Sequence, residues 1–291
     1  MTPLTLGLLA LVLSGALPAA LGRMPRLRRT PAATLVLWQA VALAAVLSAL
    51  GGGLAVVTDR VWHTDPGWPS YVVAGAALLL TALVVGRLLL TGHRVGTELR
   101  SLRRRHRHQV DLVGHRVDEN DVRVLEHPLP VAYCLPGMRR SRIVLSSGAL
   151  SRLGSGELAA VLAHERAHLK ARHDLLLEWF TVFQRSFPRG VRSGTARAEV
   201  ALLVEAHADR AAARDGRGPE LQRALGAMTG AGHPDGALGA AEDGLATRVE
   251  LLADPREHRL QAAVVRVAAA ALLVLPTALV VWPWLTALAA R

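Results

Sequence analysis

The stretch from Leu158 to Phe183 decides how this sequence is interpreted, because it is predicted to be helical and contains His164-Glu165-Arg166-Ala167-His168. Residues i and i+4 lie one above the other on the same face of a helix. The imidazoles of His164 and His168 can therefore bind one Zn²⁺, and Glu165 can act as general base toward a water molecule at the metal. The motif predicts a metallopeptidase site with one zinc ion per chain. The alternative is a helix that carries two ordinary histidines.

The third zinc ligand must come from elsewhere, because a catalytic zinc takes three protein ligands. Glu205 is the best candidate, on a second predicted helix at about 196–214. Asp209 lies one turn later on the same face and can accept the outer N–H of a ligand histidine. Glu199 would point away from Glu205. A donor for the developing oxyanion is also needed, and His207 or an arginine near the site could supply it, so His207 is kept as a catalytic candidate.

Four long apolar blocks predict that the chain crosses a membrane. The composition is 51% hydrophobic but only 4% aromatic. About 20 apolar residues span the hydrocarbon core of a bilayer. We expect three transmembrane helices within residues 1–92, at about 4–21, 34–57 and 71–90, and a fourth within 263–291. A cleaved signal peptide is the alternative for the first block, but its basic residues follow the apolar run instead of preceding it.

The distribution of charge orients these spans. Arginines crowd the segment 23–29 and the segment 94–107, whereas the segment 58–70 holds Asp59 and Asp65 against Arg60. Basic loops remain on the cytoplasmic side. The predicted topology is a multi-pass protein of a bacterial cell membrane, with both termini outside and residues 93–262 in the cytoplasm.

The net charge of +11 does not by itself predict nucleic-acid binding. Much of the excess lies next to predicted spans, where topology and anionic lipid account for it. The basic segment 103–108 has no interleaved aromatic residues for base stacking. We therefore expect the lipid bilayer and a protein or peptide substrate as partners, and no direct nucleic-acid binding.

The predicted cytoplasmic domain is α+β with a small sheet. Short strands are expected at 122–125, 132–135 and 142–146, with a helical turn at 148–153. One long helix is expected from an N-cap at Ser155 to about Phe187, and further helices at 196–214, 220–228 and 245–253. The strand 132–135 could pair with an extended substrate by backbone hydrogen bonds. Its Cys134 is the only cysteine and is expected to be a small buried side chain.

Several motifs in this order resemble a known family. They are Ala132-Tyr133-Cys134-Leu135-Pro136-Gly137, Ile143-Val144-Leu145, Gly148-Ala149-Leu150, the run from Glu157 to His168, and Arg172-His173-Asp174. Together with the spans they resemble the BlaR/MecR-type membrane zinc metallopeptidases, in a compact actinobacterial form. The related CAAX prenyl endopeptidases and HtpX-type proteases share H-E-x-x-H and E-x-x-x-D.

The resemblance implies a mainly α membrane protein with about four transmembrane helices and a cytoplasmic gluzincin-like metallopeptidase domain. It also implies a zinc-dependent endopeptidase at the cytoplasmic membrane face. In BlaR/MecR-type receptors proteolysis relieves transcriptional repression, so a winged-helix repressor is a candidate substrate. β-Lactam sensing is not expected, since no penicillin-binding domain follows the fourth predicted span.

Two alternative functions stay open. One is an HtpX-like protease for membrane-protein quality control. The other is a catalytically silent zinc-binding receptor or scaffold, against which Glu165 argues because a structural zinc site needs no general base.

Overall fold

Helices dominate the fold, and the chain divides into two units. The computed structural model describes residues 2–62, 67–117, 122–137, 141–187, 195–214, 216–228, 244–254, 256 and 258–289. The helical unit comprises Met1–His93, Phe180–Glu199 and His258–Arg291, and the sheet unit comprises Arg94–Trp179 and Val200–Glu257. Residues 180–199, which lie inside the predicted 93–262 domain, therefore group with the helical unit.

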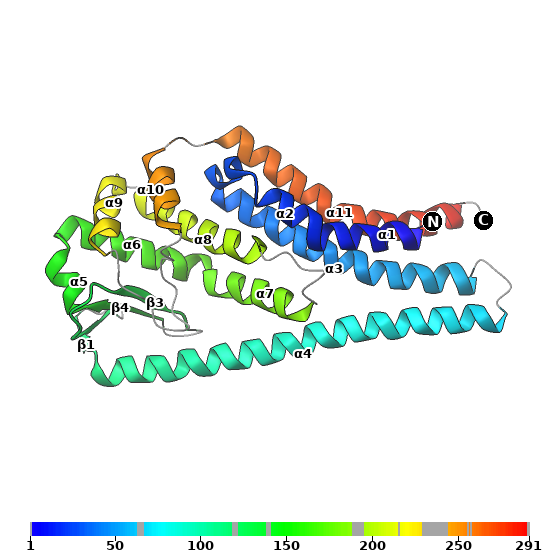
Figure 1. Ribbon diagram of the computed structural model, residues 1–291, viewed down its shortest axis with the longest axis horizontal. Helices are drawn as coiled ribbons and strands as arrows, with labels where there is room; N and C mark the ends of the chain where they lie inside the picture. The colour runs from blue at the N-terminus through cyan, green and yellow to red at the C-terminus, as the bar shows by residue number, and fades with distance from the viewer. Residues whose placement is uncertain are drawn as a thin grey trace. The chain divides into compact units, whose positions relative to one another are not determined.

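The helical unit is built around one long apolar helix. Its elements are α1 (Thr2–Leu11), the π-helical turn η1 (Val12–Ala16), α2 (Leu17–Leu21), η2 (Pro25–Arg29), α3 (Pro31–Trp62), the first part of α4 (Trp68–Val113) and α11 (Arg259–Ala289). Helix α3 packs against α1 and α11 (Figure 1). Their interface buries small and branched side chains, among them Leu37, Ala44 and Val265. Small residues let the helix backbones approach closely.

Four helices of the described chain are long and apolar enough to cross a membrane. These candidates are Thr2–Leu21, Pro31–Val61, Trp68–Val113 and Arg259–Trp282. Helix α4 departs from the predicted span of 71–90, because it runs on without a break through the arginine-rich segment. Its apolar part leaves Leu80, Leu83 and Leu89 between 60% and 69% exposed. Exposed apolar surface of this extent is typical of a face that contacts a membrane or another protein.

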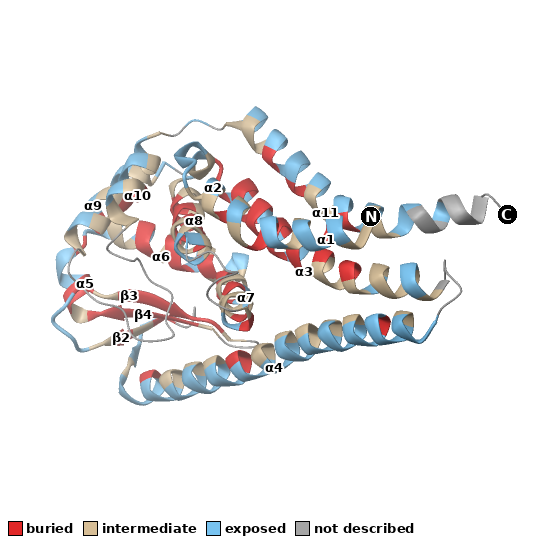
Figure 2. Ribbon diagram, turned by 45° about the vertical axis from the view of Figure 1, so that its right-hand side comes forward, coloured by how far each residue is buried: buried red, intermediate tan, exposed pale blue. Residues whose placement is uncertain are grey.

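A four-stranded mixed sheet lies in the sheet unit. The strand order is β1 (His115–Arg116), β2 (Val122–Leu125), β4 (Arg142–Ser146), β3 (Ala132–Leu135). Strands β2 and β4 are parallel, and β3 is antiparallel to β4 with Tyr133 opposite Val144. Strands β3 and β4 are buried throughout (Figure 2). The three strands expected from the sequence are confirmed, and β3 forms an edge of the sheet. The two exposed residues of β1 offered no alternating pattern and were missed.

The predicted long helix is wrong in one respect, because it is two helices. Helix α6 (Ser155–Ala171) ends at Arg172, which has a left-handed backbone with φ 53°, and α7 (His173–Ser186) begins at the next residue. The predicted N-cap is also off by one residue. Gly154 occupies the cap, and its backbone N–H donates to Glu157 Oε2 at 3.0 Å. The acidic side chain in the first turn therefore satisfies an N–H that has no partner within the helix.

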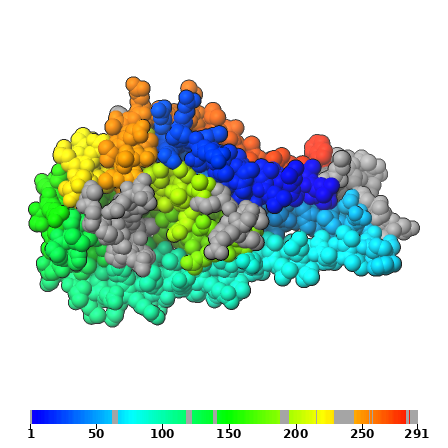
Figure 3. All heavy atoms as spheres, viewed as in Figure 1, coloured from blue at the N-terminus to red at the C-terminus, as the bar shows by residue number. Residues whose placement is uncertain are grey.

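Besides α6 and the parts of α4 and α7 that lie within Arg94–Trp179, the sheet unit contains four further helices among the described residues. They are α5 (Ser147–Arg152), the greater part of α8 (Thr195–Ala213), α9 (Gly218–Ala227) and α10 (Leu245–Ala253). Helix α9 packs against α6 and α10, and α9 and α10 lie side by side in Figures 1 and 3. Ala160, Ala212 and Leu221 form the small core where α6, α8 and α9 meet. Helix α6 also contacts β3 and β4, so it is held between the sheet and α8–α9.

Candidate metal centre

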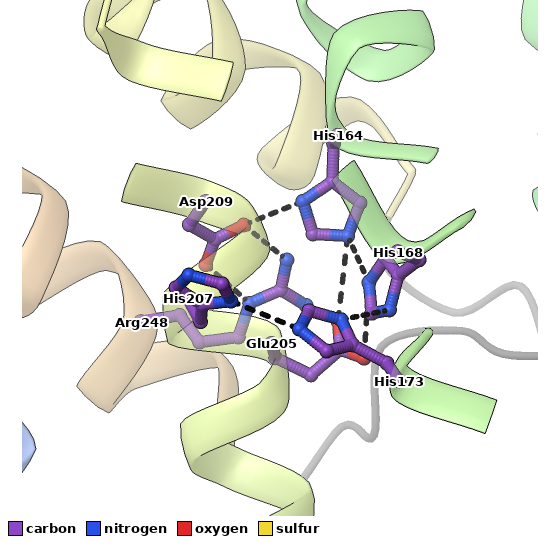
Figure 4. A network of polar contacts seen from close by, with 7 residues as sticks. All are labelled: His164, His168, His173, Glu205, His207, Asp209 and Arg248. Atoms are coloured by element: carbon purple, nitrogen blue, oxygen red, sulfur yellow. Dashed lines mark hydrogen bonds and ion pairs between the residues drawn. The ribbon is translucent and has the colours of Figure 1, made fainter. Parts of the chain in front are cut away.

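Three side chains from two helices converge at one point. His164 and His168 come from α6 and Glu205 from α8, and one ligand atom of each lies within 4.8 Å of the others (Figure 4). The Nε2 atoms of the two histidines are 3.0 Å apart. Each Nε2 lies 3.5 Å from one carboxylate oxygen of Glu205. The structure thus brings together the three residues that the sequence predicts as metal ligands.

These distances fit a tetrahedral zinc ion. Zinc bonds of about 2.0–2.2 Å to nitrogen and carboxylate oxygen place the ligand atoms about 3.3–3.6 Å apart on a tetrahedron. The observed separations differ from this by a few tenths of an ångström. All three side chains are buried, and a buried carboxylate facing two imidazoles is a donor set that a divalent cation satisfies.

Asp209 orients the first histidine. Its Oδ1 lies 2.9 Å from His164 Nδ1, the nitrogen that does not face His168. In the neutral imidazole that a metal binds, a proton on Nδ1 leaves Nε2 unprotonated and available to the metal. Asp209 lies one turn after Glu205 on α8, so a single helix supplies both the ligand carboxylate and the carboxylate that orients His164.

Arg248 is a site residue that the sequence reasoning did not identify. It lies on α10, is 1% exposed, and donates to both oxygens of Asp209 at 2.7 Å. Its Nη1 lies 3.2 Å from Glu205 Oε2. One guanidinium therefore contacts the carboxylates of both Glu205 and Asp209. No motif pointed to it, because α10 is short and many arginines of this chain lie near the predicted spans.

The charges of the site are strongly coupled. Burial alone lowers the pKa of His164, but contacts with Asp209 and Glu205 outweigh it and raise the pKa to about 10. Burial raises the pKa of Glu205 and of Asp209, yet the facing cations hold both below their usual values. Burial lowers the pKa of His168 to about 4, which makes it neutral at pH 7. The two carboxylates are therefore ionised, as metal ligation and its orienting contact require.

Glu165 has the environment of a general base. Its side chain is buried, and burial raises its pKa to about 7. Its Oε2 has no hydrogen-bond partner among the described residues. The Cys134 thiol of β3 lies close enough to lower the pKa of Glu165 slightly, and burial raises the pKa of the thiol itself well above its usual value. A buried carboxylate with an oxygen open to solvent molecules in the site can exchange a proton with a water molecule there.

His207 lies in a row of imidazoles that leads away from His168. His168 Nδ1 is 3.0 Å from His173 Nδ1, and His173 Nε2 is 2.9 Å from His207 Nδ1 (Figure 4). The structure thus places the proposed catalytic histidine against His173. A direct role of His207 toward substrate stays a prediction.

The weaker candidates have structural partners. Glu199 forms an ion pair with Arg28 in the helical unit, with Nε 3.0 Å from Oε2, which agrees with its rejection as a ligand. Arg172 and Asp174 form the expected local ion pair at 3.3 Å. Asp174 also faces Arg103 of α4 at 3.5 Å.

Comparison with known proteins agrees with this geometry. Residues 97–217 match the model of Peptidase family M48. The match supports a metallopeptidase. The matched range contains β1–β4, α5–α8 and all six predicted site residues, which are His164, Glu165, His168, Glu205, His207 and Asp209. It covers less than half of the chain and does not identify the BlaR/MecR-type branch. No curated protein and no solved structure gives a significant match.

Proposed function

We propose that this chain is a zinc-dependent endopeptidase of a bacterial cell membrane, with its active site on the cytoplasmic side. The observation that carries the proposal is the convergence of His164, His168 and Glu205 around one point, with Glu165 beside them. The match to Peptidase family M48 supports the same chemistry.

Each residue of the site has its own role in the proposed peptide hydrolysis. Zinc at this position supplies Lewis acidity, which polarises a peptide carbonyl and acidifies water. His164, His168 and Glu205 would hold it. Glu165 takes the proton from the attacking water and delivers it to the leaving amine. A pKa raised to about 7 by burial suits both transfers near neutral pH. Asp209 and Arg248 keep His164 and Glu205 in place during the reaction.

The edge strand β3 is the proposed docking site for an extended substrate. It pairs with β4 on one side, and its Cys134 contacts Glu165. A peptide added to the edge of a sheet gains backbone hydrogen bonds without needing a particular sequence. Pairing there would carry the peptide past the general base.

The membrane location rests on the four apolar helices and on the exposed leucines of α4. Arginines that follow these spans favour a cytoplasmic position for the sheet unit. The resemblance to BlaR/MecR-type proteins is what favours a transcriptional repressor as substrate.

The decisive experiment compares the wild type with Glu165→Gln. Both are purified in detergent, their zinc content is measured by elemental analysis, and peptide cleavage is followed by mass spectrometry. We expect equal zinc content and a loss of about 10²–10⁴-fold in turnover, the usual contribution of a general base. Glu250→Gln is the matched control, because Glu250 is exposed on α10 and should retain wild-type activity.

Two outcomes would refute the proposal. The first is equal cleavage by the wild type and Glu165→Gln. The second is wild-type cleavage that persists after a chelator has removed all bound metal.

A further inference from the structure

His173 lies against the metal ligand His168 on the side away from the metal point. The Nδ1 atoms of the two rings are 3.0 Å apart, and both side chains are almost fully buried. The rings meet edge to face, with centroids 4.8 Å apart. Of the two ligand histidines, His164 is oriented by a carboxylate, whereas His168 faces another imidazole.

Hydrogen-bond chemistry allows one arrangement of protons along this row when His168 binds a metal through Nε2. A neutral imidazole carries one proton, so the proton of His168 must be on Nδ1. His173 Nδ1 must then accept it, which leaves the proton of His173 on Nε2. That nitrogen lies 2.9 Å from His207 Nδ1, which can accept in turn. The Nδ1–H of His168 on α6 and the Nε2–H of His173 on α7 therefore each have an acceptor, the second of them on α8.

The helix break at Arg172 brings His173 to this position. On an unbroken helix, a residue five positions after His168 would point about 140° away from it, at 100° per residue. The left-handed backbone of Arg172 ends α6, and α7 starts in a new direction at His173. The Arg172 side chain is itself held, because Nη1 donates to the Gly137 carbonyl at 3.3 Å and Nη2 donates to Asp174 at 3.3 Å. A non-glycine residue at positive φ is strained, and this one lies beside the candidate metal centre.

We propose that His173 is a positioning residue for the zinc ligand His168: its Nδ1 accepts the His168 Nδ1–H and so keeps Nε2 of His168 free and aimed at the metal. The role presupposes the proposed zinc site. His207 serves as the next acceptor and holds the tautomer of His173 itself. Loss of such an orienting partner typically costs 10- to 100-fold in metal affinity.

The test compares two substitutions of the same shape in the full-length protein. The amide of His173→Asn can place a carbonyl oxygen near the position of Nδ1, whereas His173→Leu has the same branching and no acceptor. Zinc dissociation constants are measured by competition with a chromophoric chelator, and folding of the zinc-free protein is checked by circular dichroism. We expect His173→Leu to bind zinc about 10- to 100-fold more weakly and His173→Asn to recover most of that loss.

A second histidine provides the control. His106 Nε2 is 2.9 Å from the Tyr133 hydroxyl, and His106 has no contact with the three ligands among the described residues. His106→Leu should leave the zinc affinity unchanged. If His173→Leu does not fold, His173→Ala replaces it, because alanine also lacks an acceptor.

The outcomes separate failure of the positioning role from failure of the zinc site. Wild-type zinc affinity in His173→Leu would overturn the positioning role alone. Equal losses in folded His173→Asn and His173→Leu would also overturn it, because the acceptor would then not matter. Absence of zinc binding by the wild type, or binding that survives His164→Ala, would overturn the proposed zinc site instead.

Discussion

Replacement of Arg248 by methionine tests whether the buried guanidinium holds the site together. The substitution keeps much of the apolar volume but leaves Asp209 without two hydrogen bonds of 2.7 Å and Glu205 without a cation at 3.2 Å. Removal of one partner from a buried ion pair typically costs about 3–5 kcal/mol, because the remaining charge stays buried and uncompensated. For a unit of this size, that corresponds to a fall in the unfolding temperature of about 6–20 °C.

The assay is thermal unfolding of the metal-free protein in detergent, followed by circular dichroism. Arg223→Met is the matched control, because Arg223 is 59% exposed and pairs with Glu157 at 3.2 Å. An exposed pair contributes only about 0–1 kcal/mol. Adding Asp209→Asn to Arg248→Met should recover part of the loss by removing the orphaned charge. Equal shifts for Arg248→Met and Arg223→Met would refute the reasoning.

Two further predictions concern the pH dependence of stability and the membrane topology. Arg142 donates to Asp111 at 2.9 Å and lowers the pKa of that carboxyl below its usual 3.8. Ionised Asp111 therefore stabilises the fold fully above pH 3.8, and this stabilisation is lost as the pH falls through the lowered pKa. Asp111→Asn should therefore reduce the unfolding free energy at pH 7, by no more than about 1 kcal/mol because Asp111 is 38% exposed. The difference in unfolding free energy between this variant and the wild type should shrink in acid. A difference that does not change with pH would contradict this account. For the topology, alkaline phosphatase fused after residue 291 should be active, because the carboxyl terminus is predicted to lie outside the membrane, whereas a silent phosphatase together with a fluorescent cytoplasmic reporter at the same point would place it inside.

Local patterns account for what could be predicted. The face shared by His164 and His168 follows from helical geometry, and the strands at 122–125, 132–135 and 142–146 follow from short apolar runs between prolines and glycines. Glu205 and Asp209 were found because the spacing of four residues places them on one face of α8. The break at Arg172 was missed, because no glycine or proline marks it and a left-handed arginine has no signature in sequence.

The sequence by itself determined most of the described helices, three of the four described strands, the apolar runs and the two imidazoles on one face, because each depends on residues within a few turns of one another. Only the tertiary structure decided that β3 lies at the sheet edge, that His173 faces His168 and that Arg248 reaches Asp209 from 39 residues away. The physical reason is that these contacts depend on how helices and strands pack after the chain has turned back on itself. Buried charged side chains must be paired with one another, because an unpaired buried charge is costly. The local sequence pattern does not show which residues will form these pairs.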